Sequence, residues 1–242
     1  LEGEIRMFKP DVIIWIAPNT LTSSAIIERL PGFGAYVLLF NRVLDKPNIN
    51  YLSSDFFSDG RHLAELLVSA SGTRVLFVGH DPKTDYSAFR YQGFASALRP
   101  DCPMTSIEFS LTAYHSGSLT KKIGKALINK EFDVIVCSQD ALWQDMTIAF
   151  ADTAFNTAAL RLGCFDEISE SDPLFPQTTC LVQPIQLMSI ELMEGLRNLL
   201  SKKQSSFRKL VHSMEYKAME GVHNECISRI SSLPRSRETL LK

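Results

Sequence analysis

Short and almost wholly apolar runs recur along the chain, separated by longer segments of mixed character. The runs at 12–16, 36–40, 75–79 and 133–137 are each soon followed by proline or by polar residues. Such runs are typical of strands that are buried on both faces of a parallel sheet, because a half-exposed strand alternates apolar and polar positions. The pattern therefore predicts at least four buried strands.

Helical periodicity fills the stretches between these runs. We expect helices over 23–30, 58–71, 86–98, 116–129, 141–155 and 184–200, with further short strands near 49–53 and 105–111. Regular alternation of strands and helices implies parallel sheets that are covered by helices on both faces. The chain has more buried strands than one small sheet needs, so we predict an α/β protein of two lobes, each a doubly wound parallel sheet.

Breaks in the pattern predict where the lobes begin and end. The Ser71-Gly72-Thr73 stretch lies between a helix and a buried strand, and a second crossing is expected just before residue 181. We therefore assign residues 1–72 and 181–202 to one lobe and residues 73–180 to the other. Periodic apolar residues between 207 and 230 predict that 203–242 forms a helical tail.

Composition narrows the class of protein. Apolar residues make up 45 % and charged residues 21 % of the chain, which is ordinary for a globular protein. A net charge of −2 does not favour a chain that binds nucleic acid by itself. The five cysteines show no C-x-x-C spacing, so reduced thiols in a cytoplasmic protein are expected. No signal peptide and no apolar run of about 18 residues, the length of a membrane span, is visible.

Catalytic and metal-binding motifs are not visible. The chain has no P-loop, no nucleophile elbow, no His-Glu-x-x-His and no G-x-G-x-x-G after a predicted strand. Its histidines lack a second ligand at metal spacing. We therefore expect a binding protein rather than an enzyme, with no metal site and no cofactor.

Polar side chains follow several of the predicted strands, which is where open α/β sheets bind their ligands. The candidate ligand-binding residues are Asn41, Arg42, Thr84, Tyr86, Arg90, Gln139, Asp140 and Asp166. Arginine, carboxylate and amide groups together can satisfy hydroxyl groups, which both donate and accept hydrogen bonds. A polyol such as a sugar would fit, and so would a purine or an organic acid. The rings that could stack on a sugar are Trp15, Tyr86, Tyr114 and Trp143.

Some of these residues could equally have a purely structural role. Asp140 and Asp166 follow strands and could simply cap the next helix or turn. Arg90 could form a surface ion pair, and Trp15 could belong to the core. The sequence leaves both roles open.

Several strings occur in an order and spacing that is familiar. They are 11–14, 36–42, 72–79 followed by 87–98, 132–140, 164–167 and 175–184. The most specific is Gly72-Thr73-Arg74-Val75-Leu76-Phe77-Val78-Gly79 with the helical segment at 87–98. Together they resemble the effector-binding domain of the LacI/GalR family of bacterial transcriptional regulators, over residues 5 to 200.

The resemblance implies a two-lobed, periplasmic-binding-protein-like domain that binds a small-molecule effector, most often a sugar, between its lobes. Carried over by position, Arg90 and Asp166 would contact the effector. Asn41 or Arg42, Thr84, Tyr86, Gln139 and Asp140 would help to line the cleft. The resemblance also implies a homodimer and binding to DNA through a segment outside this chain.

The chain departs from the family pattern in several places. No helix-turn-helix segment and no first strand and helix precede residue 11, Gln139 stands where the family usually has Asn, and no closing strand is visible after Lys203. Two alternatives therefore stand beside the regulator. One is a sensory module whose output passes through the C-terminal helix, and the other is a solute-binding protein of a transport system.

Overall fold

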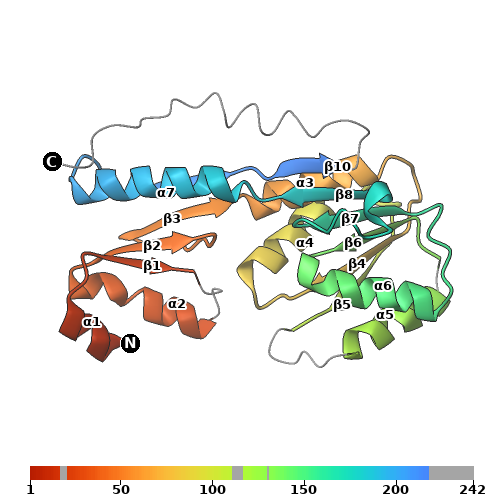
Figure 1. Ribbon diagram of the computed structural model, residues 1–242, viewed down its shortest axis with the longest axis horizontal. Helices are drawn as coiled ribbons and strands as arrows, with labels where there is room; N and C mark the ends of the chain where they lie inside the picture. The colour runs from red at the N-terminus through yellow and green to blue at the C-terminus, as the bar shows by residue number, and fades with distance from the viewer. Residues whose placement is uncertain (17–20, 111–116, 130, 218–242) are drawn as a thin grey trace.

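The computed structural model describes residues 1–16, 21–110, 117–129 and 131–217, and in this part of the chain two sheets form two lobes (Figure 1). The smaller sheet has four strands and the larger has six. All neighbouring strands are parallel except one pair at the edge of the larger sheet. The predicted α/β fold of two parallel-sheet lobes is confirmed. None of the described helices is long and apolar enough to cross a membrane.

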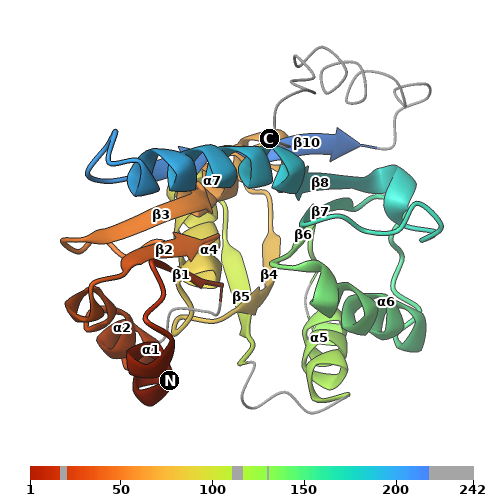
Figure 2. The ribbon, with the colours of Figure 1, turned by 60° about the vertical axis from the view of Figure 1, so that its left-hand side comes forward.

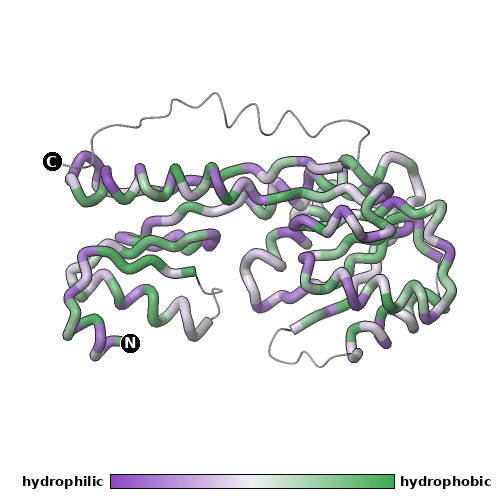
Figure 3. Tube along the Cα trace, viewed as in Figure 1, coloured by the Kyte–Doolittle hydropathy of each residue, from purple (hydrophilic) through white to green (hydrophobic). Residues whose placement is uncertain are grey.

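The smaller lobe has helices on both faces of its sheet. In spatial order its strands are β1 (Val12–Trp15), β2 (Tyr36–Phe40), β3 (Ile49–Ser54) and β9 (Arg208–Val211). On one side lie α1 (Glu2–Phe8), α2 (Leu21–Ile27) and the 3-10 turn η1 (Leu30–Phe33), and on the other lies α7 (Ile185–Leu200) (Figure 1). Strands β1 and β2 are drawn largely in green in Figure 3; β2 is the more buried of the two, because β1 lies at the edge of the sheet.

The larger lobe is built in the same way. In spatial order its strands are β10 (Met214–Lys217), β8 (Thr178–Val182), β7 (Arg161–Phe165), β6 (Val134–Cys137), β4 (Val75–His80) and β5 (Met104–Glu108). Helices α3 (Phe56–Leu67) and α4 (Asp85–Ala97) cover one face, and α5 (Ser118–Asn129) and α6 (Trp143–Asp152) cover the other. The 3-10 turns η3 (Asp140–Leu142) and η4 (Phe175–Gln177) lie after β6 and before β8.

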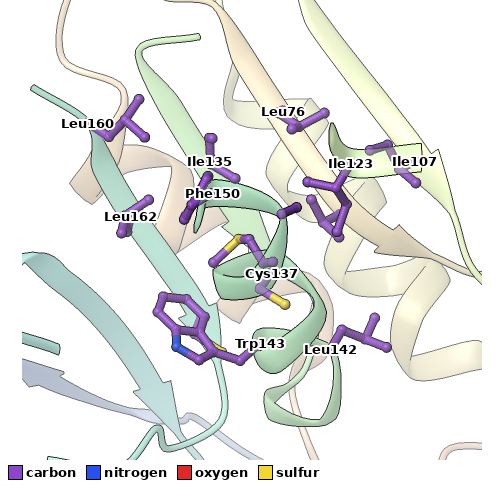
Figure 4. Close-up of a cluster of buried hydrophobic side chains, with 14 of the residues drawn as sticks. Leu76, Ile107, Ile123, Ile135, Cys137, Leu142, Trp143, Phe150, Leu160 and Leu162 are labelled. Atoms are coloured by element: carbon purple, nitrogen blue, oxygen red, sulfur yellow. The ribbon is translucent and has the colours of Figure 1, made fainter. Parts of the chain in front are cut away.

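Alternation along each strand divides the apolar residues of the larger sheet between two cores. Phe77 and Val136 pack with α3 and α4, whereas Leu76 and Ile135 pack with α5 and α6 (Figure 4). All four side chains are fully buried. A strand with both faces covered has no position that must be polar, which accounts for the continuous apolar runs of the sequence.

The chain passes between the lobes three times, from β3 to α3, from β8 to α7 and from β9 to β10. The second of these crossings can be followed in Figure 2, where α7 begins beside the end of β8. The first and third crossings are joined directly, because the backbone N–H of Asp55 donates to the carbonyl oxygen of Val211 at 2.9 Å. The third is also held by the buried Asp59 of α3. Its carboxylate accepts hydrogen bonds from the backbone N–H (3.1 Å) and the hydroxyl (2.6 Å) of Ser213. These bonds fix the point at which β9 becomes β10.

The first crossing lies earlier in the chain than the sequence pattern predicted. Residues 1–72 were assigned to one lobe, but α3 packs on the larger sheet, where its Leu63 and Leu67 meet Val75 and Phe77. The lobes therefore divide near Asp55. Strand β8 likewise continues to Val182 in the larger sheet, so the second crossing follows residue 182 rather than 180. The Gly-Thr stretch near 72 is a turn within one lobe and not a linker.

The prediction of a helical tail is wrong for its first part. Residues 208–211 and 214–217 form strands β9 and β10, which complete the two sheets, and 218–242 lie outside the described residues. Strands of four residues are too short for periodicity to distinguish from a turn of helix. The closing strand that was missing from the sequence pattern is therefore present. Phe207, just before β9, packs its ring over Gly195 of α7.

Two glycines allow α3 and α4 to approach each other closely. A Cβ atom on Gly60 would lie 2.3 Å from the carbonyl oxygen of Arg90, and one on Gly93 would lie 2.0 Å from that of Phe57. Neither distance is tolerable for a methyl group, and backbone atoms cannot move aside as a flexible side chain can. The close contact presses the first turns of α4, including Arg90, against the start of α3.

We expect Gly93→Ala to lower the free energy of unfolding by about 1–3 kcal/mol, because the added methyl group forces the helices apart. Gly3→Ala in α1 is the matched control. Its Cβ would meet nothing within 4 Å, so the usual helical preference for alanine should raise stability by up to about 1 kcal/mol. Thermal unfolding of the three proteins measures both effects. Equal melting temperatures for Gly93→Ala and the wild type would contradict the close helix contact.

Candidate functional site

The candidate site lies where strands of both sheets end. Asn41 follows β2 of the smaller sheet, and Ser138 and Asp166 follow β6 and β7 of the larger one. Arg90 reaches the same point from the second turn of α4. Hydrogen bonds join Arg90 to Ser138 and Asp166, and Gln183 joins Asp166 to Asn41. The structure therefore brings together three of the residues predicted from the sequence: Asn41, Arg90 and Asp166.

Arg90 is the central residue of the site and is 2 % exposed. Its guanidinium donates to the two carboxylate oxygens of Asp166 at 3.1 and 3.3 Å and to the carbonyl oxygen of Ser138 at 2.8 Å. Its Nε is buried, and no hydrogen-bond acceptor in the described chain reaches it. A buried cation needs acceptors such as this carboxylate and this carbonyl oxygen, since its desolvation costs several kcal/mol. Arg90 is therefore a buried, paired residue and not a surface ion pair.

Three aromatic rings surround this guanidinium. Its central carbon lies 5.1 Å from the ring centroid of Phe56, 5.8 Å from that of Tyr86 and 5.0 Å from that of Phe165. These contacts are within the range of cation–π attraction and keep water from the charge. Phe56 and Phe165 were not among the candidates, because a phenylalanine at an element end carries no polar signal in the sequence.

Asp166 and Asn41 share an unusual backbone conformation. Asp166 has φ of 96° and Asn41 has φ of 56°, both in the left-handed region that residues other than glycine seldom adopt. Such strain costs about 1–3 kcal/mol and is often found at functional sites. Here it turns the chain sharply at the end of each strand and directs both side chains to the same place. Asp166 is 25 % exposed, so its carboxylate remains accessible.

Gln183 completes the network and was missed by the sequence analysis. It lies in the second crossing between β8 and α7, where it donates from Nε2 to Asp166 Oδ1 at 2.8 Å. Its Oε1 accepts a hydrogen bond of 2.5 Å from Nδ2 of Asn41. No strand was predicted before Gln183, and the string at 175–184 contributed only to the family resemblance, so Gln183 was not recognised as a polar residue at a strand end.

A second set of contacts joins Arg42, Tyr86 and Gln139. The Arg42 guanidinium lies 5.0 Å from the ring centroid of Tyr86 and donates to the carbonyl oxygen of Asn41. The Tyr86 hydroxyl donates to Gln139 Oε1 at 3.1 Å. Burial raises the pKa of Tyr86, while Arg42 and Arg90 act in the opposite direction. The phenol therefore stays protonated and available as a hydrogen-bond donor at neutral pH.

The remaining candidates lie apart from these contacts. Thr84 precedes α4, is 4 % exposed, and its hydroxyl meets the carbonyl oxygen of Asp81 at 3.4 Å. Asp140 is exposed and accepts from the backbone N–H of Ala141 at 2.7 Å; it is the first residue of η3 and not its N-cap, which is Gln139. Trp143 is buried and donates to Asp172 at 2.8 Å, and Trp15 packs against the core of the smaller lobe. Tyr114 lies outside the described residues.

The assembled groups suit the recognition of hydroxyl groups. Carboxylate, amide, guanidinium and phenol groups offer both donors and acceptors, and aromatic rings lie beside them. Among the described residues, no group of His, Cys, Asp and Glu side chains could hold a metal ion. The four described cysteines are buried free thiols.

Comparison with known proteins gives a fold match without a sequence match. No protein-family model matches the chain, and no significant match is found among curated proteins. Solved structures do match. The Cra transcriptional dual regulator from Pseudomonas putida, in complex with fructose 1-phosphate, has a TM-score of 0.72 at 19 % identity, over 90 % of this chain and 81 % of that one.

Two binding proteins are similar as well. The myo-inositol binding protein of Caulobacter, bound to myo-inositol, has a TM-score of 0.77 at 16 % identity, over 89 % of this chain and 77 % of that one. An ABC transporter solute-binding protein from Agrobacterium vitis, with bound allitol, has a TM-score of 0.72 at 18 % identity, over 95 % and 81 %. The fold is that of the two-lobed, periplasmic-binding-protein-like domain. It matches the effector-binding domain of LacI/GalR regulators, as the sequence resemblance implied.

The strain at Asp166 gives a prediction that separates backbone from side-chain effects. Asp166→Ala and Asp166→Gly both remove the partner of the buried Arg90, and both should destabilise the protein. Only alanine keeps a Cβ at a φ of 96°, which costs about 1–2 kcal/mol. Asp166→Gly should therefore unfold at a temperature several degrees higher than Asp166→Ala.

The same pair of substitutions at Lys121, an exposed position within α5, is the control. There the order should reverse, because glycine in a helix is about 1 kcal/mol less favourable than alanine. If alanine were the more stable residue at both positions, the left-handed strain at Asp166 would be ruled out.

Proposed function

We propose that this chain is the effector-sensing domain of a bacterial transcriptional regulator of the LacI/GalR type, which binds a sugar or related polyol between its lobes. The observation that carries the proposal is the network of Arg90, Asp166, Gln183 and Asn41, which gathers hydroxyl-binding groups where strands of both lobes end. The fold supports it, since regulators and sugar-binding proteins share it. DNA would be bound by a segment outside this chain, and the working unit would be a homodimer in the cytoplasm.

Charge favours a neutral polyol over a phosphorylated sugar. The most buried cation, Arg90, is already paired with Asp166, so a phosphate placed on it would also lie against that carboxylate. The negative charges of a phosphate and of the Asp166 carboxylate would repel each other strongly, because they would lie close together in surroundings that are poor in water. Myo-inositol and allitol, found in two of the similar proteins, are neutral polyols, whereas the regulator from P. putida holds fructose 1-phosphate.

A thermal-shift screen tests the binding of sugars directly. We expect at least one neutral sugar or polyol to stabilise the protein by about 2.7 kcal/mol at a hundred times its dissociation constant. Asp166→Asn should weaken that binding by roughly 10- to 100-fold, because a charge-assisted hydrogen bond is lost while the shape of the side chain is kept. Isothermal titration of the same compound measures the change.

Asp152→Asn is the matched control for this screen. The same charge is removed at an exposed carboxylate at the C-terminal end of α6, so affinity should stay within about twofold. A sugar that binds wild type and Asp166→Asn equally would place the binding site elsewhere. A response to phosphorylated sugars alone would overturn the charge argument.

A solute-binding protein of a transport system is the second candidate, because two of the similar structures are binding proteins that hold polyols and one of them belongs to an ABC transporter. The polypeptide encoded by the complete reading frame distinguishes the two. A regulator should remain in the cytoplasm, form a dimer, and bind DNA beside its own gene with an affinity that the sugar changes at least about fivefold. Export of the protein, with no sugar-dependent DNA binding, would establish the transport role instead.

A further inference from the structure

Gln183 makes a hydrogen-bonded bridge from one lobe to the other. It lies in the second crossing, directly before Pro184, the N-cap residue of α7. Its side-chain amide accepts from Asn41 of the smaller lobe at 2.5 Å and donates to Asp166 of the larger lobe at 2.8 Å. One flexible side chain thus satisfies two groups that are held by different sheets.

The bridge continues on both sides. Asn41 also accepts, through Oδ1, a hydrogen bond of 3.4 Å from the backbone N–H of Ser54, the last residue before the first crossing. Asp166 is held by Arg90, which reaches on to the carbonyl oxygen of Ser138. The chain of contacts therefore involves two of the three crossings and the ends of β2, β3, β6 and β7.

The two ends of the bridge are fixed in their own lobes. Asn41 and Asp166 both have left-handed backbones, and Asp166 is also tied to the buried guanidinium of Arg90. Neither side chain can follow its partner if the lobes separate, because the backbone and the ion pair determine its direction. The length of Gln183 then sets how far apart Asn41 and Asp166 can lie while both remain hydrogen-bonded.

The groups that Gln183 satisfies are also the ones a polyol would use. A carboxylate offers about four acceptor sites, and an amide offers two donors and an acceptor. Asp166 Oδ1 already receives two hydrogen bonds, one from Arg90 and one from Gln183. A hydroxyl group that donates to this oxygen competes with Gln183 and not with Arg90, because the Arg90 guanidinium is buried and the Gln183 amide is half-buried.

We propose that Gln183 is a positioning residue that sets the spacing of the lobes in the ligand-free protein and gives up its bridge when a ligand hydroxyl takes its place. Occupancy of the site is then linked to lobe arrangement, since a ligand shifts a conformational balance only by binding its two states differently. The second half of this statement rests on the proposed function. The first half concerns the ligand-free protein alone.

Distance measurement between spin labels tests the ligand-free state. The labels are placed at Ser205→Cys in the smaller lobe and Lys121→Cys on α5 of the larger, both exposed, in a Cys226→Ser background. The four described native cysteines are buried and should not react. Gln183→Met keeps the length of the side chain and removes both hydrogen bonds. We expect it to shift or broaden the distance distribution by about 2 Å or more.

Two further variants control for general damage. Gln144→Met makes the same change at an exposed position of α6 and should leave the distribution unchanged. Gln183→Asn keeps the amide but is too short to span Asn41 and Asp166, so it should behave as Gln183→Met does. A melting temperature within a few degrees of wild type for either Gln183 variant shows that the lobes themselves are folded.

The decisive comparison is between the single variants at positions 41 and 183 and the double variant, whose effects on the distance distribution should not add. Asn41→Asp keeps the oxygen that accepts from Ser54 and tolerates a left-handed backbone, but it has no donor for Gln183. It should change the distribution as Gln183→Met does, and the double variant should add nothing, because both remove the bond between Asn41 and Gln183. Distributions that coincide with wild type for folded Gln183→Met and Gln183→Asn would overturn the proposal. No ligand is present in these measurements, so a failure to find a sugar would count against the proposed function and leave this result unaffected.

Discussion

A single buried charge organises the site. The Arg90 guanidinium is 2 % exposed, and its removal from water is offset by the Asp166 carboxylate, the Ser138 carbonyl oxygen and three aromatic rings. These partners come from several different elements, so the charge can be satisfied only when β6, β7, α3 and α4 are all in place. The ends of these elements are therefore constrained by electrostatics as well as by apolar packing.

This arrangement requires backbone features that are locally unfavourable. The close approach of α3 and α4 depends on Gly60 and Gly93, and the sharp exits from β2 and β7 depend on left-handed backbones at Asn41 and Asp166. Both features oppose local preferences, since glycine weakens a helix and positive φ strains other residues. The network of hydrogen bonds at the site offsets the strain. Local strain of this kind is expected where a structure is arranged for binding and not for maximum stability.

Much of the fold could be predicted because the strands of the larger lobe can be recognised from short stretches of sequence. The runs at 75–79 and 133–137 are apolar throughout since both faces of the sheet are covered, and short runs of that kind are typical of buried parallel strands. Four of the candidate residues meet in the contacts described above because the carboxyl ends of parallel strands gather in one place: Asn41, Arg42, Gln139 and Asp166. Tyr86 and Arg90 join them from the first two turns of α4.

The wrong predictions concern features of the fold that are determined by tertiary contacts and not by the local sequence. Nothing in the sequence of α3 tells which sheet it packs on, so the lobe boundary was placed too late. Four-residue strands such as β9 and β10 give no reliable periodicity, and the apolar spacing there predicted helix instead. The role of Gln183 depends on the two residues that its amide reaches, which lie 142 and 17 positions away in the chain.

The dependence of the site on contacts between distant residues bears on how one fold can serve regulation or transport. In either role the ligand must turn the occupancy of a small site into a change in how two lobes sit, and it can do so only through contacts that differ between the two arrangements. Arg90 and Asp166 lie within one lobe, so their pairing alone does not sense the other. Asn41 and Arg42 belong to the smaller lobe, and they reach the larger one through Gln183 and Tyr86. On the proposed function, binding strength would depend mainly on Arg90 and Asp166, and lobe movement on the residues that reach across.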